Sequence, residues 1–258
     1  MKIVVIAPIK GSKHKENNDD ARDSVNKQYQ QKKCCTDLPV EFEFVFIDEG
    51  PKLVLNSYDQ TYAAPGVVKK AIQAEKDGAD AIIINCTADT ALFACREAVS
   101  IPVIGPTEST FLFSTQFTDR ISVLTFSDRI NGRFYRIAKE LGMYERLTCS
   151  KTVALPLNSN KGAEDVAEAL FKAICDINKD TLCDGFMLGC SDFEGMGYML
   201  GCPGVIGVEE SLLKKLKDAD MEIVLYKPFE VAVYQAYIAA LMNMKNGSKS
   251  YPTPTVFF

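Results

Sequence analysis

Two apolar runs, one in each half of the chain, lead to a cysteine at the same place. Residues 80–86 read Asp-Ala-Ile-Ile-Ile-Asn-Cys, and residues 184–190 read Asp-Gly-Phe-Met-Leu-Gly-Cys. Continuous apolar runs of about four to eight residues are typical of strands buried on both faces of a parallel sheet. Because parallel neighbours are joined by crossovers that are usually helical, this feature favours an α/β fold.

Other segments of the two halves match as well, in the same order. Residues 2–6 resemble residues 120–124, and residues 103–108 loosely resemble residues 225–230. We therefore expect two pseudo-symmetric α/β lobes with mainly parallel sheets and an active-site cleft between the lobes. The similarity of any two α/β halves would explain the order of elements, but it explains the matching cysteine positions poorly.

The alternation of apolar and helical stretches predicts the elements of each lobe. The first lobe, 1–106 plus 226–258, has expected strands at 3–7, 40–48, 81–85 and 103–104, and helices at 62–76 and 90–99. The second lobe, 107–225, has expected strands at 121–125, 153–157, 185–188 and 223–225, and helices at 163–178 and 209–217.

Two insertions and a tail lie outside this pattern. The polar stretch 10–33 favours a solvated loop over a lid, and the other insertion is the glycine-rich stretch 195–207. The tail 246–258 is expected to be extended, with its apolar end packed on a lobe or on a second subunit.

Composition excludes several classes of function. A net charge of -5 gives no reason to expect nucleic acid or an anionic membrane as partner. No apolar run approaches the roughly 18–20 residues of a membrane span, and the start of the chain reads as a strand. The nine cysteines form no CxxC pair and His14 is the only histidine, so we expect neither a metal site nor a disulfide framework. This cysteine usage is typical of a reducing cytoplasm.

The chemistry is expected at Cys86 and Cys190, because ligands of parallel sheets collect at the carboxyl ends of strands. Each cysteine precedes a small polar residue, Thr87 or Ser191, and the approach to a helix. Free backbone amides and the helix dipole would lower the thiol pKa from about 8.5 toward neutrality. The same amides could bind a carboxylate or imide oxygen of a substrate.

Two such thiols on opposite sides of one carbon make a racemase. One thiolate removes the proton, and the second thiol returns a proton to the other face. His14 lies in the polar stretch, so a hydrolase triad is not expected, and the chain has neither a phosphate-binding loop nor a recognisable Schiff-base lysine. We therefore expect no cofactor. The mechanism requires that both sulfurs reach one bound molecule and that neither is buried in a hydrophobic interior.

Four segments in this order resemble the aspartate/glutamate/hydantoin racemase superfamily, and most closely its hydantoin racemase branch. They are Asn-Cys-Thr-Ala-Asp at 85–89, Pro-Val-Ile-Gly-Pro-Thr-Glu-Ser at 102–109, Arg-Ile-Ser-Val-Leu-Thr at 120–125 and Leu-Gly-Cys at 188–190. The resemblance covers about residues 79–230. It implies a homo-oligomer and no cofactor.

The resemblance also implies roles for single residues. Cys86 and Cys190 would be the catalytic acid–base pair, while Thr87 and Ser191 would bind substrate through their amides and hydroxyls. The pocket would further be lined by Thr125, Pro8 and Ile9, which lie at strand ends.

The chain departs from the family pattern in two places. Ala7-Pro8-Ile9-Lys10 replaces an Asn-Pro-Asn-type turn, which leaves the identity of the substrate open. A second Leu-Gly-Cys ends at Cys202, but Cys190 is preferred because a buried strand leads into it.

We therefore expect a cofactor-independent racemase of a small carbonyl compound with an acidic C–H, such as a 5-substituted hydantoin or an amino-acid derivative. The alternatives are an aspartate or glutamate racemase, a maleate-isomerase-type enzyme, a decarboxylase, or a two-lobed binding protein whose cysteines only pack. A decarboxylase could work with a single cysteine, so the pair favours racemisation. Asp89 is expected to stabilise a helix N-terminus.

Overall fold

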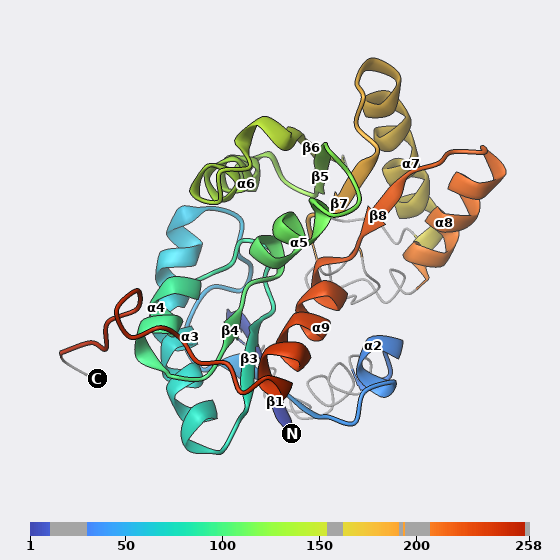
Figure 1. The fold of residues 1–258 in the computed structure, drawn as a ribbon. Helices are drawn as coiled ribbons and strands as arrows, with labels where there is room; N and C mark the ends of the chain where they lie inside the picture. Colours follow the sequence, from blue (N-terminus) through green and yellow to red (C-terminus); the bar gives the residue numbers. More distant parts are fainter. Residues whose placement is uncertain (11–29, 154–161, 191–192, 194–206, 256–258) are drawn as a thin grey trace, which may run out of the picture. The chain divides into compact units, whose positions relative to one another are not determined.

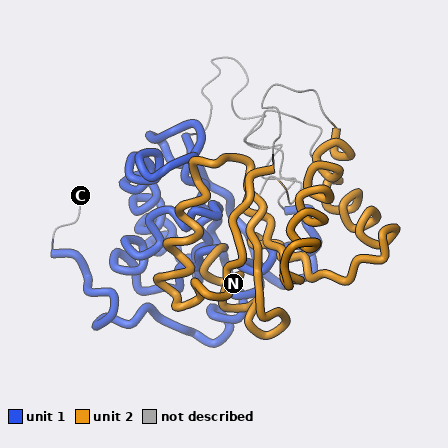
Figure 2. Tube along the Cα trace, turned by 90° about the horizontal axis from the view of Figure 1, so that it is seen from above, with its two compact units in different colours: residues 1–106, 230–258 blue, residues 107–229 orange. Residues whose placement is uncertain are grey.

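The computed structural model describes residues 1–10, 30–153, 162–190, 193 and 207–255 (Figure 1). Outside the described residues therefore lie the expected insertion 195–207 except Gly207, most of the insertion 10–33, Ser191, Cys202 and the last three residues of the tail. The chain divides into two compact units, residues 1–106 with 230–258 and residues 107–229 (Figure 2).

The first unit holds one sheet and its helices. Its elements are β1 (Lys2–Lys10), α2 (Lys33–Thr36), β2 (Glu41–Ile47), α3 (Ser57–Lys76), β3 (Ala81–Ile84), α4 (Leu92–Ala98) and β4 (Val103–Ile104). The four strands are all parallel, in the order β2-β1-β3-β4. Every residue of β3 is buried, because α3 and α4 pack their apolar side chains on this sheet.

The second unit repeats this arrangement. Its elements are α5 (Pro106–Ser114), β5 (Ile121–Thr125), α6 (Asp128–Glu140), the 3-10 turn η1 (Tyr144–Arg146), β6 (Leu147–Thr152), α7 (Ala163–Asp180), β7 (Gly185–Leu188), α8 (Val208–Asp218) and β8 (Val224–Tyr226). Its sheet is also parallel, in the order β6-β5-β7-β8. The predicted α/β class with two repeated parallel sheets is therefore confirmed.

In the second half, one predicted strand differs from the structure and one helix was not predicted. The strand expected at 153–157 is β6, which ends at Thr152, and residues 154–157 lie outside the described residues. The prediction failed because β6 is mostly half-buried and its sequence, Leu-Thr-Cys-Ser-Lys-Thr, is polar. Helix α6 was not predicted, although Ser127 caps it by accepting from the Arg129 N–H and Ile130, Phe134 and Ile137 form a buried stripe.

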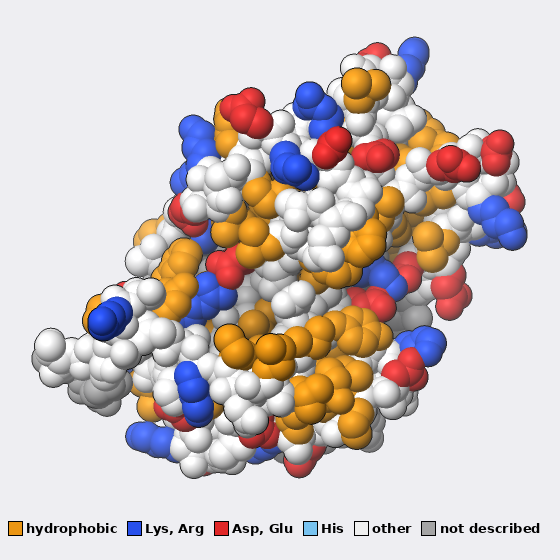
Figure 3. Space-filling view, viewed as in Figure 1, with side chains coloured by type: hydrophobic (Ala, Val, Ile, Leu, Met, Phe, Trp, Pro, Cys, Tyr) orange, Lys and Arg blue, Asp and Glu red, His pale blue; other side chains and the backbone are white. Residues whose placement is uncertain are grey.

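Helix α9 (Pro228–Leu241) is apolar on its buried and its exposed side. Phe229, Val233 and Ala236 are buried, whereas Ile238 and Leu241 are exposed. Figure 3 shows hydrophobic side chains grouped over this helix. Even so, within the described ranges no helix has the length and apolar character that crossing a membrane requires.

The tail that follows α9 is fixed to the first unit by one asparagine. The Asn246 side-chain amide donates to the carbonyls of Val99 (2.9 Å) and Ile101 (2.7 Å). The Tyr251 ring lies beside the Arg96 guanidinium, whose carbon is 5.6 Å from the ring centre. The tail was predicted to be extended, but residues 248–250 form a turn, closed by the Ser250 N–H donating to the Gly247 carbonyl.

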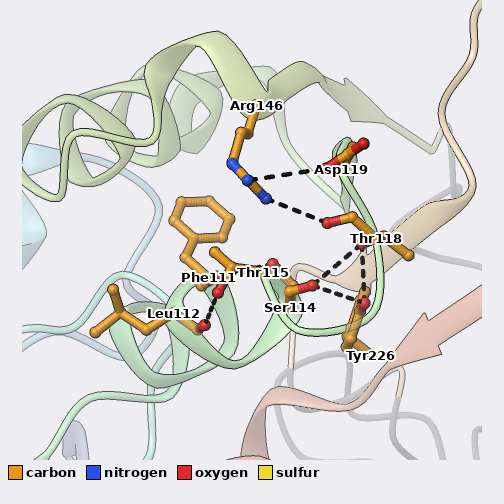
Figure 4. A network of polar contacts seen from close by, with 8 residues as sticks. All are labelled: Phe111, Leu112, Ser114, Thr115, Thr118, Asp119, Arg146 and Tyr226. Atoms are coloured by element: carbon orange, nitrogen blue, oxygen red, sulfur yellow. Dashed lines mark hydrogen bonds and ion pairs between the residues drawn. The ribbon is translucent and has the colours of Figure 1, made fainter.

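A buried polar network joins the end of α5 to β8 in the second unit (Figure 4). The Tyr226 hydroxyl lies 2.9 Å from the Thr118 hydroxyl and donates to the Ser114 carbonyl at 3.4 Å. Arg146 donates to the Thr118 carbonyl at 3.4 Å. Burial raises the pKa of Tyr226, so its phenol keeps the proton that it donates.

Replacing Tyr226 with phenylalanine is expected to lower the free energy of unfolding by about 1 kcal/mol, because the buried Thr118 hydroxyl loses its 2.9 Å partner and keeps only the 3.5 Å bond to the Ser114 carbonyl. Urea unfolding followed by circular dichroism should show a lower midpoint at unchanged slope. The matched control is Tyr144→Phe, since Tyr144 is exposed and its replacement should change stability by less than about 0.5 kcal/mol. Equal stability of both variants would contradict the role given to this hydroxyl.

Candidate active site

Cys86 begins a turn directly beyond the carboxyl end of β3. The Asn85 N–H donates to the Ile6 carbonyl at 2.8 Å, which extends the pairing with β1 one residue beyond β3. The carbonyl of Cys86 then accepts from the Asp89 N–H at 2.9 Å and closes the turn. Cys86 itself is half-buried, so its sulfur lies at the edge of the sheet rather than in the centre of the core.

The turn after Cys86 contains two residues in the left-handed region of backbone space. Asp89 has a φ of 50° and Ala91 a φ of 59°. For residues with a β-carbon this conformation costs of order 1–2 kcal/mol, and such strain is found preferentially at functional sites. Helix α4 was expected to begin near residue 90. It begins at Leu92, after these two left-handed residues.

Asp89 is buried against the end of β4. A β-carbon added to Gly105 would lie 2.7 Å from Asp89 Cγ and 2.6 Å from Leu92 Cδ2. Glycine at position 105 therefore allows the backbone to approach the Asp89 carboxyl group. Asp89 was expected to stabilise a helix N-terminus, and its backbone carbonyl accepts from the Leu92 N–H at 3.3 Å.

Thr90 is the residue of this turn that sequence reasoning missed. Its side chain is fully buried, and its hydroxyl donates to Cys86 Sγ at 3.4 Å. The sequence gives no signal for this bond, because it depends on the left-handed residues on either side of Thr90. Thr87, which was expected to bind substrate, lies next to Cys86 and is also buried.

Cys190 occupies the equivalent place in the second unit. The Gly189 N–H donates to the Leu124 carbonyl at 2.7 Å, as Asn85 does to Ile6. The Cys190 carbonyl accepts from the Phe193 N–H at 3.0 Å, as Cys86 does from Asp89. Each cysteine is therefore the second residue beyond an equivalent strand, and its carbonyl accepts from the N–H three residues ahead.

The surroundings of Cys190 differ from those of Cys86. Cys190 is 3% exposed and belongs to the apolar cluster of the second unit, together with Phe193 and Leu124, so the expectation that neither sulfur is buried in a hydrophobic interior is wrong for Cys190. Gly189 is tightly enclosed, since an added β-carbon would lie 2.7 Å from the Leu124 carbonyl oxygen and 2.8 Å from Val123 Cγ1. Ser191, which was expected to bind substrate, lies outside the described residues.

Three further predicted pocket residues lie on the central strands. The Thr125 hydroxyl is buried and donates to Asn131 Oδ1 at 2.6 Å, so it also fixes α6 to β5. Pro8 and Ile9 were placed just beyond the first strand, but β1 continues to Lys10. The pairing with β2 shifts register between Ala7 and Lys10, where Pro8 has no N–H to donate.

Three other described thiols are poorly suited to acid–base chemistry. Burial raises the pKa of Cys95 to about 12 and also raises that of Cys183. A hydrogen bond with Cys34, together with burial, raises the pKa of Cys35. These thiols stay protonated at neutral pH. Among the residues with described positions, no three His, Cys, Asp or Glu side chains are grouped so that they could hold a metal ion.

Comparison with known proteins gives both sequence and fold relatives. The family model described as Asp/Glu/Hydantoin racemase matches residues 24–229. A hydantoin racemase of Pseudomonas sp. (strain NS671) is 25% identical over 205 residues, which cover 75% of this chain and 81% of that protein.

Two solved structures share the fold at 17% identity. The allantoin racemase from Klebsiella pneumoniae has a TM-score of 0.77, with 100% of this chain and 95% of that chain covered. The allantoin racemase from Pseudomonas fluorescens has a TM-score of 0.75, with 100% and 99% covered.

Proposed function

The chain belongs to the Asp/Glu/hydantoin racemase family, and on this premise we propose that it is a cofactor-independent racemase with Cys86 and Cys190 as its acid–base pair. The observation that carries the proposal is the repeated turn. Each cysteine is the second residue beyond an equivalent parallel strand, and each carbonyl closes a turn with the third residue ahead. Two thiols in matched backbone settings suit a reaction in which acid and base exchange roles.

The proposed reaction moves one proton off a carbon and another proton onto it. One cysteine thiolate takes the hydrogen from the stereocentre, and the electron pair of the broken C–H bond moves onto the adjacent carbonyl as an enolate. The other cysteine thiol then gives its proton to the opposite face, so that the enantiomer leaves and the thiol and thiolate have changed places. The mechanism thus requires both sulfurs to reach the same carbon, so the proposal includes the exposure of Cys190, which is 3% exposed in the structure, to the bound substrate.

The developing enolate needs hydrogen-bond donors that are already in place. Backbone N–H groups around Thr87 and Ser191 are the proposed donors, since both residues directly follow a cysteine. The substrate carbonyl is itself the acceptor of the electron pair. The reaction is therefore proposed to need neither a metal nor an organic cofactor.

A 5-substituted hydantoin is the proposed substrate class. Its ring places a carbonyl beside the C–H that must ionise, and the sequence relative from Pseudomonas sp. is a hydantoin racemase. Allantoin is itself a 5-substituted hydantoin, so it belongs to the same class. Aspartate and glutamate lack the ring and are the second class to test.

The test is a panel of single enantiomers of hydantoins, allantoin, aspartate and glutamate incubated with the full chain in D2O. Loss of circular dichroism should accompany deuterium uptake at the stereocentre, measured by proton NMR, and the rate should survive dialysis against EDTA. The Cys86→Ala/Cys190→Ala double variant supplies the blank for spontaneous exchange. Release of CO2, or no exchange with any compound, would contradict the proposal.

A further inference from the structure

The turn that carries Cys86 brings a buried hydroxyl to its sulfur. Thr90 is fully buried and lies four residues beyond Cys86, yet its hydroxyl donates to Cys86 Sγ at 3.4 Å. Residues four apart are neighbours on an α-helix, but Cys86 and Thr90 both precede α4, which begins at Leu92. The contact instead depends on Asp89 and Ala91, whose left-handed backbones lie on either side of Thr90. The chain therefore bears local strain in the segment that holds this hydroxyl beside the sulfur.

We propose that Thr90 is a positioning residue, which fixes the orientation of Cys86 Sγ and favours its thiolate over its thiol. The proposal rests on the proposed function in taking Cys86 as one of the two bases. A hydroxyl that donates to a charged acceptor forms a stronger hydrogen bond than one that donates to a neutral acceptor. Its bond therefore stabilises the thiolate more than the thiol.

The burial of Thr90 strengthens this stabilisation of the thiolate. The hydroxyl itself has no acid–base role. Water cannot easily replace a fully buried donor, and the local dielectric is lower than in solvent. A threonine hydroxyl is neutral at every pH of interest, so it does not take the substrate proton. In the second unit, the residue equivalent in spacing to Thr90 is 194, which lies outside the described residues. The proposal is therefore confined to Cys86.

Two substitutions of Thr90 distinguish the effect of its hydroxyl hydrogen bond from the effect of its packing. Thr90→Val keeps the branched shape and removes the donor, whereas Thr90→Ser keeps the donor and removes the methyl group. If the hydroxyl stabilises the thiolate, Thr90→Val should raise the pH midpoint of Cys86 alkylation by about one unit. Below that midpoint the rate should fall roughly three- to tenfold, because a more basic thiolate is also more nucleophilic. Thr90→Ser should stay close to the parent protein.

The measurement is the rate of iodoacetamide labelling of the full chain as a function of pH, read by mass spectrometry after trypsin digestion. The peptide between Lys76 and Arg96 contains both Cys86 and Cys95. Cys95 is fully buried with a pKa raised to about 12, so its slow labelling is an internal standard for each variant. Thr118→Val removes a buried threonine hydroxyl from the second unit and should leave the Cys86 midpoint unchanged.

An unchanged midpoint in Thr90→Val, or an equal shift in Thr90→Ser, would overturn the proposal. Thr90→Ala replaces Thr90→Val if the valine variant fails to fold by circular dichroism. Labelling needs no substrate, so the outcome does not depend on racemisation. A shifted midpoint in a protein that racemises nothing would support the hydrogen bond and contradict the proposed function, whereas racemisation with no shift would contradict only the role of Thr90.

Discussion

Replacing either Cys86 or Cys190 with alanine is expected to lower racemisation by about 10²–10⁴-fold, the range that a positioned acid or base contributes. The two cysteines follow β3 and β7 in different units and are proposed to act on opposite faces of the substrate carbon, so neither should substitute for the other. Circular dichroism of a single enantiomer, followed against time, measures this loss.

The single variants should also differ in which enantiomer they still exchange. A protein with one remaining thiolate can remove a proton from one face and return deuterium to that same face. We expect Cys86→Ala and Cys190→Ala each to exchange one enantiomer in D2O with retained configuration, and to act on opposite enantiomers. Proton NMR reads the exchange, and chiral chromatography reads the configuration.

Cys175→Ala is the matched control, since Cys175 is a partly exposed thiol on α7 whose pKa burial raises. This variant should racemise at the parent rate. Full activity in either catalytic variant would refute the two-base mechanism. Exchange of the same enantiomer by both catalytic variants would also contradict it.

Replacing Gly189 with alanine should destabilise the second unit and remove activity together. The new β-carbon would lie 2.7 Å from the Leu124 carbonyl oxygen, which is backbone and cannot move aside without shifting β5. Overpacking of this kind costs about 1–3 kcal/mol. Because Cys190 is the next residue, the strand displacement that relieves the clash also moves the proposed acid–base group.

Gly132→Ala gives the control for Gly189→Ala. Gly132 lies inside α6, where an added β-carbon would meet only the end of the Arg136 side chain at an ordinary 3.5 Å. Alanine there should stabilise the protein by about 0.5–1 kcal/mol, since glycine is a poor helix former. Thermal unfolding should therefore move in opposite directions for the two variants. A Gly189→Ala protein with parent stability would show that β5 and β7 are not packed as described.

The strands in the middle of each sheet were predictable from sequence, and an edge strand was not. The predicted bounds 121–125 and 185–188 coincide with β5 and β7. Both are buried along their whole length, so β7 reads Gly-Phe-Met-Leu and β5 is apolar except for Ser122 and Thr125, whose buried hydroxyls are hydrogen-bonded. Strand β6 lies at the edge of the sheet, where half-exposed positions accept Ser150 and Lys151, and the apolar pattern that marks a strand is lost.

The candidate site also has a part that could be predicted from the sequence and a part that could not. The positions of Cys86 and Cys190 at strand ends followed from the apolar runs before them. The contact of Thr90 with Cys86 Sγ could not be predicted, because no propensity scale assigns left-handed backbone to Asp89 and Ala91. Such conformations are imposed by the surroundings, here the close approach of Gly105 to Asp89.

The difference between the two cysteine environments has a kinetic consequence. Cys86 is half-buried and accepts a hydroxyl hydrogen bond, whereas Cys190 is 3% exposed and belongs to the apolar cluster of the second unit. Enantiomers have equal free energies, so the ratio kcat/KM must be the same in both directions whatever the thiols are like. Inequality between the sulfurs therefore cannot change this ratio, and it acts instead on the relative energies of the two enzyme–substrate complexes and of the two protonation forms of the free enzyme. It would appear as compensating differences in kcat and KM for the left- and right-handed substrate.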